Sequence, residues 1–257
     1  MEIQVDRFRR LGSIAALLCL GIVDCSRPGS PALSLEELIH RNTEARGGRG
    51  AIEAIRNLEV KLRIVEPTYT ADGVWRVDRR GRMRIDVFMK DQRVFTEAFD
   101  GERGWQMPGG NEAATPASPD GTAALRHSGQ LPTNILGLHE MMGHGHRLEY
   151  AGREEVAGVS YHVVVLTLDD GFATRYYIDP ENFLIARARV RKALHPDIDP
   201  TPTTIETVWT DLREVAGVRF AFQASDTDLA AGRLLQTTTL LEITPDASLD
   251  ENLFRMP

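Results

Sequence analysis

The densest group of side chains able to do chemistry lies near the middle of the chain. It reads His139-Glu140-Met141-Met142-Gly143-His144-Gly145-His146. Imidazole nitrogens and carboxylate oxygens are ligands that Zn²⁺ accepts, so a metal-assisted hydrolase centred on His139, Glu140, His144 and His146 is one hypothesis. Zinc proteases instead place two histidines four residues apart, with a glutamate directly after the first. Because two glycines would fray any helix presenting this group, a solvated loop is the alternative reading, and we predict no metal site.

Other signatures of catalysis are missing from the sequence. It contains no Gly-x-Ser-x-Gly elbow, no phosphate-binding loop and no dinucleotide fingerprint. Two pairs of adjacent acids, Asp169-Asp170 and Glu154-Glu155, are candidates for a catalytic dyad. Adjacent strand residues point to opposite faces, so these pairs are better explained as turn and surface charge. We therefore predict no catalytic residue, no cofactor and no enzymatic activity.

A basic stretch is the remaining chemical feature. Arg187, Arg189 and Arg191 occupy alternate positions of a predicted strand and are followed by Lys192. Three guanidinium groups on one face are suited to the phosphates of lipid headgroups or to acidic polymers. A solvated strand face is the alternative explanation.

Composition limits the classes of protein that remain. The chain has 257 residues, 42% of them hydrophobic and 26% charged, which is typical of a folded protein and excludes disorder. Thirty basic against 37 acidic residues give a formal charge of −7. Because nucleic-acid binding needs a basic surface, we expect no nucleic-acid partner.

The first 25 residues are predicted to be an export signal. Three arginines precede an apolar run from Leu11 to Val23, which is too short for a membrane span of about 20 residues. Cleavage after Cys25 would leave a chain without cysteine, in which 26–257 form a single domain of a soluble, periplasmic protein. The alternative is that Cys25 is the lipidated first residue of an envelope lipoprotein, although Asp24 before it argues against that signal.

The start of the remaining chain predicts helices followed by strands. Ser34 and Glu37 form a capping box for an amphipathic helix that ends at Gly47-Gly48, and a short helical segment follows over 51–56. From Leu58 the hydrophobic period changes to two, and it returns after successive turn signals as far as Met107. An antiparallel meander with one apolar face is expected.

A break and a second meander follow. Residues 108–132 are rich in Pro, Gly, Ala and Ser and predict a loop, after which apolar residues from Ile135 to Met142 fall at helical intervals. Seven more strands are predicted between Arg147 and Ile243. The fold class is therefore α+β, with roughly a dozen strands in a highly curved, open antiparallel sheet around a few helices.

This order of elements resembles the outer-membrane lipoprotein-sorting family, the LolA/LolB type of periplasmic carriers. Short motifs add to the likeness: Arg82-Met83-Arg84-Ile85, Tyr176-Tyr177-Ile178-Asp179-Pro180, Val215-Ala216-Gly217-Val218-Arg219-Phe220 and the closing Leu253-Phe254-Arg255-Met256-Pro257. The resemblance covers nearly all of the chain after the export signal. It rests on overall layout more than on a diagnostic signature.

The resemblance implies an open half-barrel whose apolar cavity accepts acyl chains under a helical lid. The inward residues would be Leu58, Val60, Leu62, Ile64, Trp75, Val77, Met83, Ile85 and Val87, with Ile135, Leu138 and Met142 as the lid. It also implies that an arginine holds the lid closed, and the strand arginines of this chain leave its identity open. The same residues are equally compatible with an ordinary packed core.

Three hypotheses follow. The first is an exported, monomeric, non-enzymatic carrier or sensor of lipid or lipoprotein acyl chains, with peripheral contact to the membrane. The second is a module of the same fold with a filled core that binds envelope proteins along a sheet edge. The metal-assisted hydrolase is the third.

Overall fold

Two helices precede the sheet in the computed structural model, which describes residues 33–110 and 112–257. Helix α1 (Leu35–Arg46) begins at Ser34, whose hydroxyl accepts a hydrogen bond from the Glu37 amide at 3.1 Å, confirming the predicted cap. Helix α2 (Arg49–Ala54) follows. Leu33–Pro257 form one unit. The predicted export signal over 1–25 and the fate of Cys25 lie outside the described residues.

The first meander follows these helices. Its strands are β1 (Asn57–Glu66), β2 (Tyr69–Asp78), β3 (Met83–Met89), β4 (Gln92–Phe99), β5 (Gly104–Pro108) and the two-residue β6 (Thr115–Pro116). Strand β1 shows the alternating burial that its sequence predicts, with Leu58, Val60 and Leu62 buried. One face of this meander therefore belongs to the core.

The second meander contains seven strands, as predicted. They are β7 (Arg147–Val156), β8 (Val159–Thr167), β9 (Ala173–Ile178), β10 (Ile185–Lys192), β11 (Thr203–Val215), β12 (Val218–Asp228) and β13 (Arg233–Pro245). The last three strands are the longest of this meander, at 13, 11 and 13 residues.

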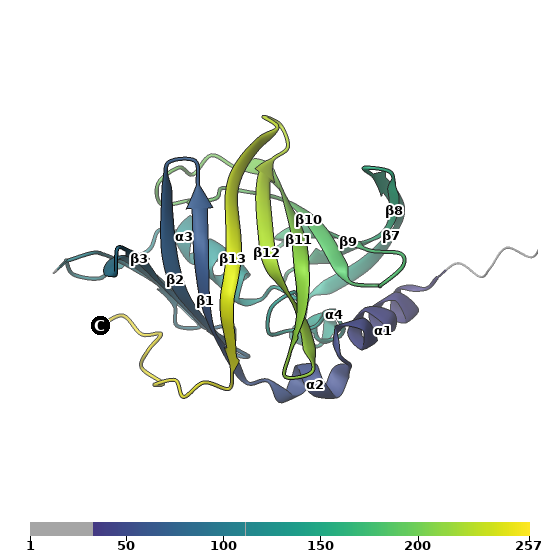
Figure 1. Cartoon of the computed structure of the whole chain (residues 1–257), viewed down its shortest axis with the longest axis horizontal. Coiled ribbons are helices and arrows are strands. Elements are labelled where there is room, and N and C mark those ends of the chain that lie inside the picture. Colours follow the sequence, from purple (N-terminus) through teal and green to yellow (C-terminus); the bar gives the residue numbers. More distant parts are fainter. Residues whose placement is uncertain (1–32, 111) are drawn as a thin grey trace, which may run out of the picture. The chain divides into compact units, whose positions relative to one another are not determined.

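All thirteen strands found in residues 33–110 and 112–257 form one antiparallel sheet. Strand β13 pairs with β1 and thereby joins the two meanders, which leaves β6 and β7 as the two edges. The sheet is strongly curved but does not close (Figure 1). This confirms the predicted α+β class with an open, curved sheet of about a dozen strands.

The helical insertion differs from the prediction. Helix α3 (Pro119–Gly129) lies within the segment 108–132 that was expected to be a loop. Its start is a standard one, since the Ser118 hydroxyl caps Gly121 and Pro119 fits the first turn. The expected helix over 135–142 is only a single turn, α4 (Leu138–Met141), continued by the 3₁₀ turn η1 (Met142–His144).

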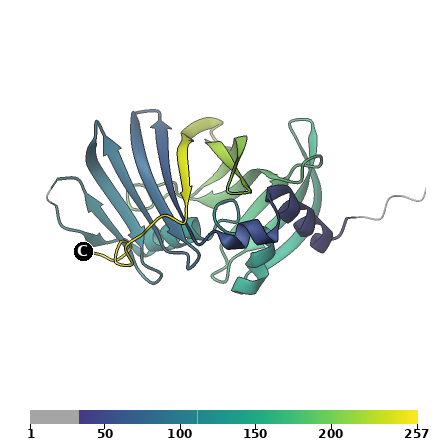
Figure 2. The same cartoon turned by 60° about the horizontal axis from the view of Figure 1, so that its bottom comes forward.

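The helices lie in two groups. Helix α1 contacts α2, α4 and β12, and α3 contacts β3, β4 and β5. Figure 2 shows α1 and α2, in purple, in front of the strands of the second meander. One hydrophobic core includes buried side chains from α1, α2, α3, α4 and both meanders. Within the described residues no helix is both long and apolar enough to cross a membrane.

A glycine fixes the approach of α1 to the sheet. Gly47 ends α1 with φ +129°, and a Cβ atom there would lie 1.9 Å from the main-chain oxygen of Gly217 in the turn between β11 and β12. No other residue type fits this position without moving backbone. The Gly47-Gly48 stop predicted from the sequence thus anchors the helix against the second meander.

Candidate functional site

The predicted inward residues come together on the concave face of the sheet. Seven of the twelve are buried in the larger of the two hydrophobic clusters: Leu58, Val60, Leu62, Val77, Met83, Ile135 and Leu138. Ile64, Trp75 and Ile85 are half-buried against the same core. Val87 is also half-buried but is not part of the core cluster. Sheet and lid residues therefore meet as expected, and whether they bind a ligand stays a prediction.

The placement of Met142 is a correction. Its side chain is 59% exposed, whereas that of Met141 is fully buried. The reason is the single turn of α4: Leu138 and Met141, three residues apart, share its inner face. Met142 begins the 3₁₀ turn and faces away from the core. We define the lid as residues 131–144, with Ile135, Leu136, Leu138 and Met141 as its buried apolar side chains.

Sequence reasoning missed the concave residues of the second meander. Leu240 on β13 lies opposite Leu62, and Trp209 and Phe222 belong to the same core. The signal was clear only on β12, where Val218, Phe220 and Phe222 occupy alternate positions and are buried. The missed residues extend the apolar face across the β1–β13 junction.

A buried guanidinium holds the lid. Arg46, in the last turn of α1, is 4% exposed. It donates to the main-chain oxygens of Pro132, Asn134 and Leu136 at 2.7, 2.8 and 2.6 Å. Burial lowers the pKa of Arg46 to about 10, with Arg79 adding to the effect and Glu140 opposing it. The arginine that binds the main chain of the lid is therefore on a helix and not among the strand arginines considered from the sequence.

A second arginine fastens the lid from the β2–β3 turn. Arg79 donates to Glu140 Oε1 at 2.5 Å and to the Ile55 carbonyl at 2.6 Å. The other carboxylate oxygen of Glu140 accepts the Gly137 amide at 2.8 Å. This ion pair is mostly buried, so α4 is tied to the sheet by charge as well as by apolar packing.

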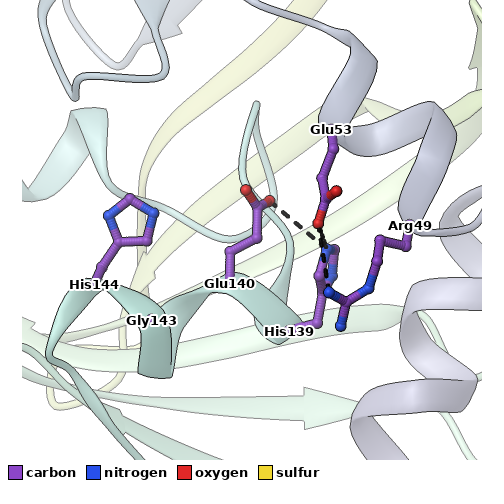
Figure 3. A pocket seen from close by; sticks show the side chains of 6 residues that line it. All are labelled: Arg49, Glu53, His139, Glu140, Gly143 and His144. Carbon is purple, nitrogen blue, oxygen red and sulfur yellow. Dashed lines mark ion pairs between the residues drawn. The ribbon is translucent and has the colours of Figure 1, made fainter.

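The predicted histidine cluster is divided by the fold. His139 and His144 line a cavity of about 300 Å³ together with Arg49, Glu53, Glu140 and Gly143 (Figure 3). His146 is buried and does not line it. Across residues 33–110 and 112–257, no three metal-ligating side chains are grouped closely enough to hold a metal ion. The metal-hydrolase hypothesis thus finds no ligand set here, and Glu53 is a member of this site that the sequence did not indicate.

The strand arginines are engaged with acids. Arg187 donates to Glu206 at 3.0 Å, and Arg189 donates to Glu206 and Glu154, each at 2.8 Å. Glu154, read from the sequence as surface charge, is a member of this network. Arg187 and Arg189 are therefore neutralised by acids and largely shielded from solvent, over the rings of Tyr161 and Tyr177. This argues against headgroup binding by these two arginines and differs from the solvated face given as the alternative.

Comparison with known proteins gives a fold but no close relative. No family model and no curated protein matches the chain. A DUF1329 family protein from Desulfovibrio piger superimposes with a TM-score of 0.57 at 11% identity, over 86% of this chain and 96% of that one. A LolA superfamily protein from Nitrosomonas europaea superimposes with a TM-score of 0.56 at 11% identity, over 87% and 98% of the two chains. A domain from Vibrio parahaemolyticus assigned to the outer membrane lipoprotein-sorting proteins also has a TM-score of 0.56 at 11% identity, over 86% and 97%. At 11% identity these likenesses show a shared fold, the open and strongly curved antiparallel sheet, and that sheet is also the fold of the LolA superfamily protein named above.

Proposed function

We propose that this protein is an exported, non-enzymatic carrier or sensor that binds acyl chains of lipids or lipoproteins between the concave face of its sheet and the lid. The shared fold supports this, since one of the similar structures is assigned to lipoprotein sorting. A periplasmic location belongs to the same proposal and rests on the export signal read in residues 1–25.

The observation that carries the proposal is the attachment of the lid by Arg46. A buried cation normally pairs with a carboxylate, yet the three hydrogen bonds of Arg46 all go to neutral main-chain oxygens. Lid opening returns this guanidinium to water and so recovers part of its desolvation cost. This recovered free energy reduces the difference in stability between the closed and the open state of the lid.

Opening the lid exposes the side chains that an acyl chain needs. Leu136, Leu138 and Met141 leave the core, and the strand residues beneath them lose their cover. An acyl chain that replaces them regains about 25 cal/mol for each Å² of apolar surface it buries. Methionine suits such a site because its flexible thioether repacks around different chains.

The experiment is native mass spectrometry of the protein purified without detergent, before and after incubation with phospholipid vesicles. Adducts with the masses of acyl lipids are expected. Ile64 and Val65 provide a matched pair, because they are neighbours on β1 that face opposite sides and Val65 is 44% exposed. Ile64→Gln is expected to reduce lipid adducts and Val65→Gln to leave them unchanged; equal effects of the two would contradict a site on the concave face.

A second candidate function is supported by the packing of the closed state. The predicted inward residues of the strands and of the lid pack in one hydrophobic core, and seven of them are buried there. A filled core is what a protein-binding module of this fold would have. The same spectra distinguish the candidates, because such a module stays free of lipid after incubation with vesicles, and they also test the expected monomer.

A further inference from the structure

The cavity between α2 and the lid contains a buried nitrogen without a partner. The His139 side chain is 5% exposed, and its Nε2 atom makes no hydrogen bond although it is fully enclosed. Figure 3 shows this ring facing Glu53 and Arg49 of α2. A buried polar atom left without a partner costs free energy, which a ligand can recover.

Hydrogen bonding on the far side of the ring assigns its protons. The Thr43 hydroxyl donates its only proton to the Ile39 carbonyl at 2.9 Å, so it acts as an acceptor toward His139 Nδ1 at 3.1 Å. Nδ1 therefore carries the proton of the neutral ring. The lone pair of Nε2 lies against the exposed side chain of Glu53, and a ligand reaches it when that side chain turns outward. Burial also lowers the pKa of His139, which keeps the ring neutral near pH 7.

A second acceptor faces this lone pair. Glu53 Oε1 lies 3.4 Å from His139 Nε2, and two acceptors at this distance repel each other unless a donor lies between them. Arg49 is the nearest cation to Glu53, at 3.7 Å, and both side chains are exposed. Glu140 is already engaged by Arg79 and the Gly137 amide. The inner end of the cavity, formed by His139 and Glu53, is therefore suited to a ligand group with several N–H donors and a positive charge.

The outer end of the cavity has the opposite requirement. The Arg49 side chain is 67% exposed and makes only the long contact with Glu53, so its planar set of donors can bind an oxyanion. A ligand that suits both ends carries an ammonium and a phosphate a few bonds apart. About 300 Å³ is enough space for such a group.

We infer that this cavity binds a phosphoethanolamine group, with its ammonium donating to His139 Nε2 and Glu53 and its phosphate against Arg49. The inference rests on the proposed function, since it names the headgroup of a lipid whose acyl chains would enter under the lid. A primary ammonium is favoured over a metal ion because the described residues group no three metal-ligating side chains together. It is favoured over a quaternary ammonium because the two acceptors need N–H donors.

The test uses water-soluble headgroups, so that it does not depend on acyl-chain binding. Glycerophosphoethanolamine and glycerophosphocholine are titrated into the purified protein by isothermal calorimetry, with ¹⁵N NMR of the His139 ring as a second readout. The ethanolamine compound is expected to bind at least about tenfold more tightly and to shift the Nε2 resonance, because only it donates hydrogen bonds. Equal binding of the two compounds, binding of neither, or an Nε2 atom already protonated in the free protein would overturn the inference.

Variants locate the site on the protein. Glu53→Gln and Arg49→Ala change exposed residues of α2, so folding should be unaffected, and each is expected to weaken binding roughly tenfold. Arg56→Ala, which removes an 80% exposed arginine just beyond α2, is the matched control and should leave affinity unchanged. If Arg56→Ala weakened binding while Glu53→Gln and Arg49→Ala did not, the headgroup site would not be at Glu53 and Arg49.

Vesicles then identify the source of the headgroup. If the protein sediments with phosphatidylethanolamine vesicles and the Glu53→Gln variant does not, the headgroup belongs to a membrane lipid. Binding of the soluble compound without binding of vesicles would support the same site for a free phosphoethanolamine metabolite. If lipid adducts form under the lid while neither form of the headgroup binds, the carrier proposal stands and this inference fails.

Discussion

At the scale of single residues, the unusual feature is a cation buried among neutral partners. Arg46 satisfies three main-chain oxygens of the lid that would otherwise be unpaired in the core. Its position in the last turn of α1 is also favourable for a positive charge at a helix C-terminus. Arg46 therefore attaches the lid to α1 by three hydrogen bonds.

Arg46→Met tests this attachment. The methionine keeps much of the apolar stem but leaves three carbonyls without donors, so we expect the free energy of unfolding to fall by about 2 kcal/mol. Hydrogen exchange followed by mass spectrometry should show faster exchange over 132–141 than in the sheet. Arg41→Met, which removes an exposed arginine of the same helix, is the control. Unchanged exchange of the lid would show that Arg46 does not hold it.

Glu97 provides a second prediction at this scale. By register with Ile85 it lies on the concave face, and burial raises the pKa of Glu97, with His195 opposing and Asp197 adding to the effect. A raised carboxyl pKa contributes stability at acid pH that is lost as the pH rises through it. Glu97→Gln should therefore raise the melting temperature at pH 7 and have less effect at pH 4. The exposed Glu102→Gln is the control, and a lower melting temperature of Glu97→Gln at pH 7 would contradict the prediction.

At the scale of elements, the lid depends on how α1 meets the second meander. The close approach of Gly47 to Gly217 sets the end of α1, and Arg46 is the residue just before it. Thr43 and Arg46, one helical turn apart, both contact the lid segment through His139 and its carbonyls. A displaced helix end would therefore release the lid and disturb the cavity together.

Two glycine substitutions test how tightly the end of α1 is held against the second meander. Gly47→Ala should lower the free energy of unfolding by more than about 2 kcal/mol, because the methyl group meets a backbone oxygen at positive φ. Gly50→Ala lies in α2 with open space around its Cβ position and should raise stability by up to about 1 kcal/mol. Denaturant unfolding measures both. Similar results for the two variants would mean that the α1 end is not tightly fixed.

At the scale of the whole molecule, acid sensitivity is expected from three histidines. Burial lowers the pKa of His139, His146 and His162. The unfolded chain, with histidine pKa values near about 6.5, then binds more protons than the folded protein, so stability falls as the pH drops below that value.

The measurement is the melting temperature between pH 7.5 and pH 5.5. A decrease toward acid pH is expected in the native protein. His162→Gln, which keeps a polar partner near Tyr150 but removes the titration, should flatten part of that decrease. A melting temperature that stays constant over this range would contradict the attribution of acid sensitivity to these buried histidines.

Much of the architecture follows from local patterns. The N-cap at Ser34, the stop at Gly47-Gly48 and the alternation along β1 are properties of neighbouring residues, and the structure confirms each one. Of the predicted capping box only the serine half is present, because the Glu37 carboxylate accepts from Arg41. Helix α3 was missed because its cap, Ser118 followed by Pro119, has the same composition as a loop. The choice between Met141 and Met142 depended on where a single turn of helix begins, which periodicity does not resolve.

The sequence by itself determined the fold class, the number of strands to within one or two, and the apolar face of the first meander, because these depend on periods of two and 3.6 residues along the chain. Only the tertiary structure decided which arginines contact the lid and which acid faces His139. Arg46 is 86 residues before Pro132 and 90 before Leu136. Glu53 reaches His139 only because α2 and α4 converge on α1. Such contacts depend on the register of the whole sheet, and no local pattern encodes them.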